Sequence, residues 1–185
     1  MTDLSIPLDL RPEAFADFYA KLGMCVTAYQ SIEDRLPFVF WVCLRGSRAR
    51  AKALFTSVQG LERKQGMIDA ALLDQESVFQ EQWDDLRSRI KAHFDFRNKI
   101  AHAQVSIHGG GIQLSLDDMG EPVGFKRLGE PRMEARKLGK SGNWETISVA
   151  QMSEAYAAMQ RTSADLNLFS QAMRSQFTPP PAASR

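Results

Sequence analysis

The sequence predicts a mainly α-helical protein, an antiparallel four-helix up-and-down bundle with a small β-hairpin insert between the third and fourth helices. Three observations lead to this fold class. Most apolar side chains recur at steps of three and four residues, the spacing of a helix that buries one face. Residues 104–116 alternate instead between apolar and polar side chains around three glycines. The connections between the helical stretches are short, which favours antiparallel neighbours.

Composition limits the class of protein. The chain has 185 residues, of which 44% are hydrophobic and 24% charged, and this balance suits one domain with a substantial core. It excludes a mostly disordered chain, a fibre and a bundle of membrane helices. The formal net charge of +1 is low for a protein that coats DNA, so contact with nucleic acid must rest on local clusters of charge. The first residues lack the pattern of a secretory signal, and we expect a cytoplasmic protein with no membrane partner.

The predicted organisation is simple. Residues 1–10 form an N-terminal arm, residues 11–177 a single helical domain and residues 178–185 a flexible tail. Within the domain, residues 104–143 are the β-hairpin and loop insert.

The first helix is expected to start near residue 11, because Pro12 is tolerated in a first turn. Its apolar stripe continues through Cys25 to Cys43, and Pro37 is expected to kink it by removing one backbone hydrogen bond. Both cysteines lie among apolar residues, which predicts buried, reduced thiols.

A second helix is expected from Ser47, weakened by glycines at positions 60 and 66. Residues 45–64 contain six cations and one acid, a block that is either a solvated face or a place beside a phosphate. The third helix, residues 75–103, has the cleanest apolar period, in which the next core position falls on Arg97.

After the third helix, residues 104–108 and 112–116 read as two strands of a hairpin around the glycines, and residues 123–128 as a further strand. The last helix is expected from Ser148, which forms a capping box with Gln151.

The candidate site residues lie at the end of the third helix. Arg97 stands where a core residue is expected, and a guanidinium is costly to bury without an acceptor such as a carboxylate or a phosphate. His102 lies on the polar face, where Asn98, four residues earlier, is its neighbour on the helix. An imidazole titrates near neutral pH and can act as an acid or a base.

The string Arg97-Asn98-Lys99-Ile100-Ala101-His102 resembles the signature of the HEPN superfamily, an arginine, a polar residue and a histidine near the end of a long helix in a four-helix bundle. The first helix is also similar, with Glu33 as the polar residue that would face the motif. The resemblance implies either a metal-independent ribonuclease or an inactive relative that only binds. It further implies a homodimer whose two motifs face one another, and a toxin or phage-defence role with a possible antitoxin partner.

In that chemistry His102 exchanges a proton with the RNA, Arg97 holds the phosphate and Asn98 orients the histidine or donates to the phosphate. Two other interpretations stay open. One is a non-catalytic helical module that binds a nucleotide or a protein in the same groove. The other is a structural role for Arg97, in an ion pair between subunits with an acid such as Asp95.

No other catalytic or metal-binding site is predicted. Of the three histidines, His93 adjoins the apolar stripe and is expected to be a packing residue, and His108 adjoins the glycine turn. No cluster of ligands has metal spacing, and no phosphate-binding glycine loop precedes a helix, so we expect neither a metal nor a cofactor.

Overall fold

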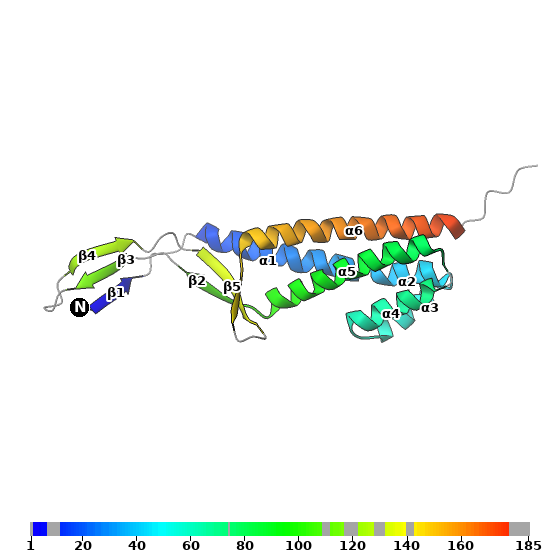
Figure 1. Ribbon diagram of the computed structural model, residues 1–185, viewed down its shortest axis with the longest axis horizontal. Coiled ribbons are helices and arrows are strands. Elements are labelled where there is room, and N and C mark those ends of the chain that lie inside the picture. The colour runs from blue at the N-terminus through cyan, green and yellow to red at the C-terminus, as the bar shows by residue number, and fades with distance from the viewer. Residues whose placement is uncertain are drawn as a thin grey trace, which may run out of the picture. The chain divides into compact units, whose positions relative to one another are not determined.

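The computed structural model describes residues 2–6, 12–73, 75–108, 112–116, 122–127, 132–139 and 143–177 (Figure 1). It is mainly helical, as predicted, with a smaller β part. The chain divides into two compact units. The sheet unit comprises residues 1–24 and 98–154, and the helical unit comprises residues 25–97 and 155–185. The predicted tail at 178–185 and the glycine turn at 109–111 lie outside the described residues.

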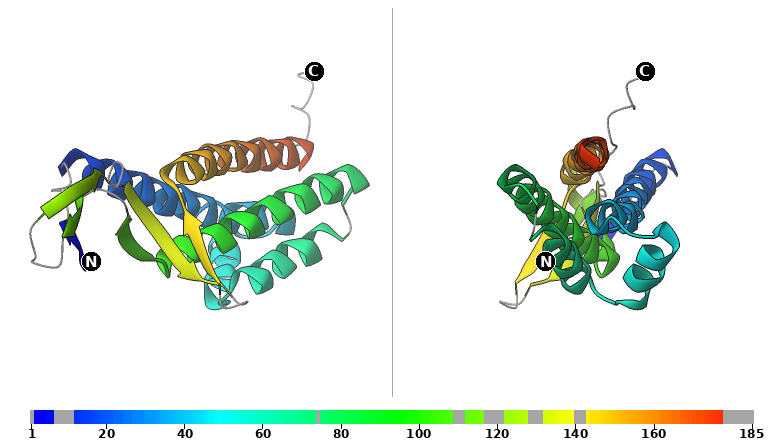
Figure 2. Two further views of the ribbon diagram at one scale, coloured as in Figure 1. Left: turned by 60° about the vertical axis from the view of Figure 1, so that its left-hand side comes forward. Right: turned by 90° about the vertical axis from the view of Figure 1, so that its right-hand side faces the viewer.

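Six helices are present in the part of the chain that the structure describes, more than the four predicted. They are α1 (Pro12–Glu33), α2 (Leu36–Leu44), α3 (Arg48–Ser57), α4 (Leu61–Leu72), α5 (Ser77–Ala101) and α6 (Val149–Phe177), and they can be followed in Figures 1 and 2. None of these helices is long and apolar enough to cross a bilayer.

The two extra helices arise from breaks at a proline and a glycine. The predicted kink at Pro37 is a complete break, because α1 ends at Glu33 and Pro37 occupies the first turn of α2. In a first turn the missing N–H costs nothing. The predicted second helix is likewise two helices, since Gly60, with φ of +88°, separates α3 from α4. A side-chain-bearing residue rarely adopts this backbone conformation.

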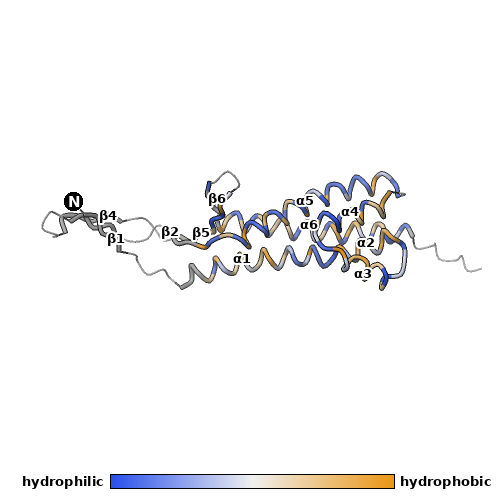
Figure 3. Tube along the Cα trace, turned by 90° about the horizontal axis from the view of Figure 1, so that it is seen from below, coloured by the Kyte–Doolittle hydropathy of each residue, from blue (hydrophilic) through white to orange (hydrophobic). Residues whose placement is uncertain are grey.

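The core of the helical unit gathers around α2, which is apolar on all sides and is mostly orange in Figure 3. The aromatic rings of Trp83 on α5 and Phe169 on α6 lie 6.2 Å apart between centroids, so these helices pack side by side. The Trp83 indole donates a hydrogen bond of 2.6 Å to Asp69 of α4. Both cysteines are buried, and burial raises the pKa of the Cys43 thiol to about 12, which makes it inert as a nucleophile at neutral pH.

The sheet unit contains two antiparallel three-stranded sheets, with strand orders β1-β3-β4 and β2-β5-β6. Their strands are β1 (Thr2–Ile6), β2 (Gln104–His108), β3 (Ile112–Leu116), β4 (Pro122–Arg127), β5 (Arg132–Leu138) and β6 (Trp144–Ile147). The strands at β2 and β3 and the further strand at β4 occur where the sequence predicts them.

The pairing of these strands differs from the prediction. β2 and β3 do not form a hairpin with one another, because β2 pairs with β5 and β3 pairs with both β1 and β4. The expected N-terminal arm therefore contains a strand, with Thr2 opposite Leu116. Strand β5, which the sequence analysis left in the loop of the insert, and strand β6, to which it assigned no structure, complete the second sheet. Alternation of side chains shows where strands are but leaves their partners open.

The predicted capping box at the start of α6 is confirmed. The backbone N–H of Gln151 donates to the Ser148 hydroxyl at 3.2 Å, and the Ser148 N–H donates to the Gln151 side chain at 2.9 Å. Two of the unpaired donors at this helix end are thereby satisfied.

Candidate functional site

The motif residues lie at the carboxyl end of α5 and in the turn that follows. Arg97 and Asn98 are inside the helix, which ends at Ala101, so His102 is the first residue beyond it rather than part of the last turn. The His102 N–H still donates to the Asn98 carbonyl oxygen at 3.2 Å, which continues the helical geometry by one residue. This backbone hydrogen bond keeps Asn98 and His102 one helical turn apart.

Within the helical unit, Arg97 is half-buried and interacts electrostatically with Tyr29 of α1. Tyr29 is only 2% exposed, and its hydroxyl has no partner at hydrogen-bonding geometry among the described residues. Burial raises the pKa of Tyr29 most, the nearby Glu33 carboxylate raises it further, and the positive charge of Arg97 acts in the opposite direction. Glu33 and Arg97 therefore both act on one buried phenol.

Two further residues of α5 border this group, which we call the Tyr29 cluster (Tyr29, Glu33 and Arg97). The Phe94 ring contacts the Tyr29 ring with centroids 6.0 Å apart. Asp95 is exposed and pairs with Lys91 at 3.9 Å on the same helix. Asp95 thus has an ion-pair partner, Lys91, within its own chain.

Within the sheet unit, two motif residues without a proposed catalytic role, Lys99 and Ile100, fix the end of α5. Lys99 forms an ion pair of 2.5 Å with Glu145 of β6, and this contact lowers the pKa of the Glu145 carboxyl. Ile100 is 3% exposed and anchors the helix end in the core. Asn98 is half-buried, whereas His102 is exposed to solvent.

The structure therefore brings the predicted residues together in two groups. The charges of Glu33 and Arg97 both influence the pKa of Tyr29 in the helical unit, and Asn98 and His102 share a turn in the sheet unit. The sequence analysis missed Tyr29, whose apolar spacing concealed a hydroxyl at a core position. It also missed Glu145, because a contact between a helix end and a distant strand leaves no local pattern.

His93, the predicted packing histidine, is buried on α5 and lies 2.9 Å from the Thr162 hydroxyl of α6. Burial, and then the charges of Arg89 and Arg161, lower the pKa of His93.

This shift predicts a loss of stability in acid. Because the folded-state pKa lies below the unfolded value near 6.5, the unfolded chain binds the proton first. The contribution of His93 is present above that pH and is lost as the pH falls through the folded-state pKa. We expect the urea midpoint to decrease on acidification from neutral pH, and to decrease less in the His93→Gln variant, which retains a polar group near Thr162. Equal decreases in the two proteins would contradict this assignment.

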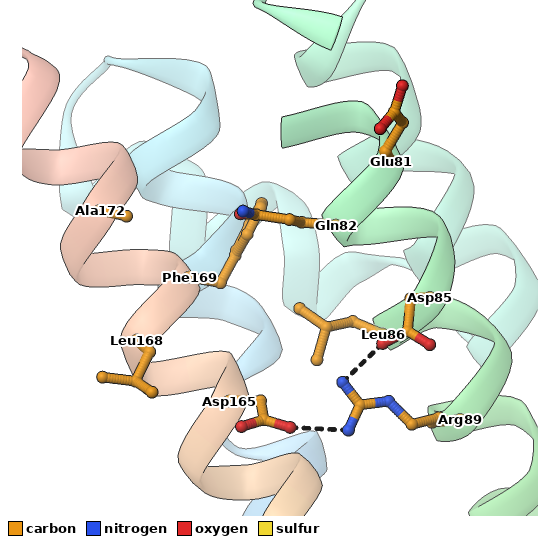
Figure 4. Close-up of a pocket in the computed structure, with 9 residues that line it drawn as sticks. All are labelled: Glu81, Gln82, Asp85, Leu86, Arg89, Asp165, Leu168, Phe169 and Ala172. Atoms are coloured by element: carbon orange, nitrogen blue, oxygen red, sulfur yellow. Dashed lines mark hydrogen bonds and ion pairs between the residues drawn. The ribbon is translucent and has the colours of Figure 1, made fainter. Parts of the chain in front are cut away.

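A separate concave site lies between α5 and α6 in the helical unit, with a volume of about 490 Å³. Figure 4 shows Arg89 between two carboxylates, and it pairs with Asp85 and with Asp165 at 2.7 Å each. Leu86 and Phe169 supply apolar lining, and Leu168 is 63% exposed. Arg89, Asp85 and Asp165 pair with one another, and the exposed Leu168 side chain adds apolar surface beside them.

Among the described residues, no group of three or more His, Cys, Asp or Glu side chains is arranged to hold a metal ion. Comparisons with models of known protein families, with curated proteins and with solved structures find no match to this chain.

Proposed function

We propose that this protein is a HEPN-like, metal-independent endoribonuclease of the toxin or defence type, built on an antiparallel bundle of helices. The observation that carries the proposal is that one six-residue motif contains both a half-buried cation and an exposed imidazole. Arg97 is a half-buried cation beside a buried phenol, and His102 is an exposed imidazole at the helix end. A fixed cation and an accessible acid–base group are what cleavage of a phosphodiester requires.

In the proposed reaction the ribose 2′-oxygen attacks the adjacent phosphorus, and its proton passes to a base. The bond from phosphorus to the 5′-oxygen breaks, and an acid protonates that oxygen as it leaves. The products are a 2′,3′-cyclic phosphate and a 5′-hydroxyl. His102 serves as acid or base, Arg97 stabilises the charge on the phosphate oxygens, and Asn98 orients His102 or donates to the phosphate.

One motif histidine cannot be both the base and the acid in the same step. We therefore propose a homodimer in which a second copy of the chain supplies the other histidine. Glu33, whose negative charge lies near Tyr29 as the positive charge of Arg97 does, orients Arg97 electrostatically and does not touch the substrate. An antitoxin that covers the motif is the expected protein partner.

The test is cleavage of end-labelled single-stranded RNA in the presence of EDTA. We expect fragments that end in a 2′,3′-cyclic phosphate, and activity that chelation does not reduce. Cleavage that needs a divalent metal, or fragments with 3′-hydroxyl ends, would exclude this mechanism.

The second candidate is a non-catalytic helical interaction module that binds a nucleotide or a protein. The groove between α5 and α6 favours it, because Leu168 leaves apolar surface open beside a pocket. This candidate predicts that RNA survives incubation intact and that substitution of His102 changes nothing.

A further inference from the structure

One short helix of the helical unit carries a cluster of exposed cations. α3 presents Arg48, Arg50 and Lys52 to solvent, and it contains no acidic residue. Among the described residues, none forms an ion pair with these three side chains. We call Arg48, Arg50 and Lys52 the α3 basic surface.

The neighbouring helix does not neutralise this surface. Glu62 is the one acid in residues 45–64, and its carboxylate lies 3.4 Å from Lys91 of α5. Lys64 of α4 lies over the Phe55 ring of α3 at 5.7 Å, which adds a further cation beside the helix. The positive charge here is therefore local and uncompensated, although the whole chain is nearly neutral.

Arg48 is also held in place. Its guanidinium lies 5.5 Å from the centroid of the Trp41 ring, and the Trp41 indole donates to the Gly46 carbonyl oxygen at 2.9 Å. A guanidinium over an aromatic face keeps its in-plane N–H donors available for an oxyanion. The side chain then loses less conformational entropy when a phosphate binds.

The position of these charges is unfavourable for the isolated helix. Arg48 and Arg50 stand in the first turn, where the helix dipole is positive, and the Ser47 side chain makes no capping hydrogen bond. Arg48 and Lys52 are neighbours on one side of the buried stripe of Ala51 and Phe55, and Arg50 lies on the other. An extended anion that crosses α3 would relieve this repulsion on both sides.

We infer that the α3 basic surface binds the phosphate backbone of single-stranded RNA and so holds the substrate of the proposed nuclease. The inference rests on the proposed function for the identity of the polyanion. The contacts are to phosphate and carry no sequence preference. This surface is separate from the motif residues and takes no part in proton transfer.

The experiment measures the binding of a labelled oligouridylate by anisotropy over a range of KCl concentrations. It uses full-length protein with His102→Ala, so that cleavage does not interfere. To this background we add Arg48→Gln, Arg50→Gln and Lys52→Gln together. Each phosphate contact on a single strand contributes about 0.7 to the salt slope, so the slope should decrease by about 2. At about 0.1 M KCl the affinity should then fall on the order of 100-fold.

The matched control removes the same charge from α5 and α6, with Arg87→Gln, Arg161→Gln and Arg174→Gln, all of which replace exposed residues and leave the pair of Glu62 with Lys91 intact. We expect the control to bind within about twofold of the parent, because nonspecific net charge contributes little at this salt concentration. Equal losses in the two triple variants would overturn the inference. So would binding of anionic phospholipid vesicles through α3 without binding of RNA.

The two proposals fail in different ways. RNA binding that depends on α3, in a protein that never cleaves RNA, keeps the surface and rejects the nuclease. Cleavage that is unaffected by the α3 variant keeps the nuclease and rejects the surface. In the absence of RNA, the α3 variant should melt at a higher temperature than the parent, because the repulsion in the first turn is gone.

Discussion

Replacement of His102 by alanine is expected to slow RNA cleavage by about 100-fold to 10,000-fold, the range typical of a lost general acid or base. His102 is exposed and follows the end of α5, so few contacts of the fold depend on its ring. The melting temperature should therefore stay within about 2 °C of the parent. The measurement is the initial rate of cleavage of labelled RNA, taken with thermal melts of the same preparations.

Two further measurements separate a chemical role of His102 from a structural one. Added imidazole should restore part of the activity of His102→Ala, because a small base can enter the space that the ring vacates. The matched control is His108→Ala, which removes a histidine of β2 outside the motif and should cleave at the parent rate. Loss of activity in both histidine variants, or none in His102→Ala, would contradict the assignment.

Replacement of Arg97 should have the second largest effect, and two substitutions divide it into parts. Arg97→Lys keeps the positive charge beside Tyr29 and Glu33 but loses the planar fork that binds two phosphate oxygens. We expect cleavage to fall about 100-fold or more, on the scale of one lost donor to a developing oxyanion. The melting temperature should change little.

Arg97→Ala should reduce activity at least as much and also destabilise the fold. Without Arg97, its positive charge no longer offsets the negative charge of the half-buried Glu33 carboxylate near the buried Tyr29. We expect a loss of about 1–3 kcal/mol in the free energy of unfolding, measured by urea denaturation. An Arg97→Lys variant that cleaves RNA normally would show that charge alone is needed and would remove the proposed phosphate fork.

The helices were accessible to sequence reasoning because their signals are local. The stripe through Trp83, Leu86 and Ile90 placed α5 to within two residues at either end, and Ser148 with Gln151 marked the start of α6. The breaks at Pro37 and Gly60 were visible as weak points, but whether a proline kinks a helix or begins a new one depends on what packs around it.

The candidate site was accessible in part. An arginine on an apolar stripe and a histidine five residues later stand out in the sequence, and Glu33 was singled out through the resemblance of the first helix. The Tyr29 hydroxyl was not, because a tyrosine with apolar spacing looks like any core aromatic until its neighbours are known.

By itself, the sequence determined the mainly helical class, the bounds of several elements and the placement of Arg97, Asn98 and His102 at the end of one helix. These properties follow from interactions between residues a few positions apart. Only the tertiary structure decided that β2 pairs with β5 and β3 with β1, that Lys99 reaches Glu145, and that the charge of Arg97 acts on the buried Tyr29. Each of these interactions joins segments distant along the chain, and a periodic pattern of side chains does not specify which distant segment will pack against it.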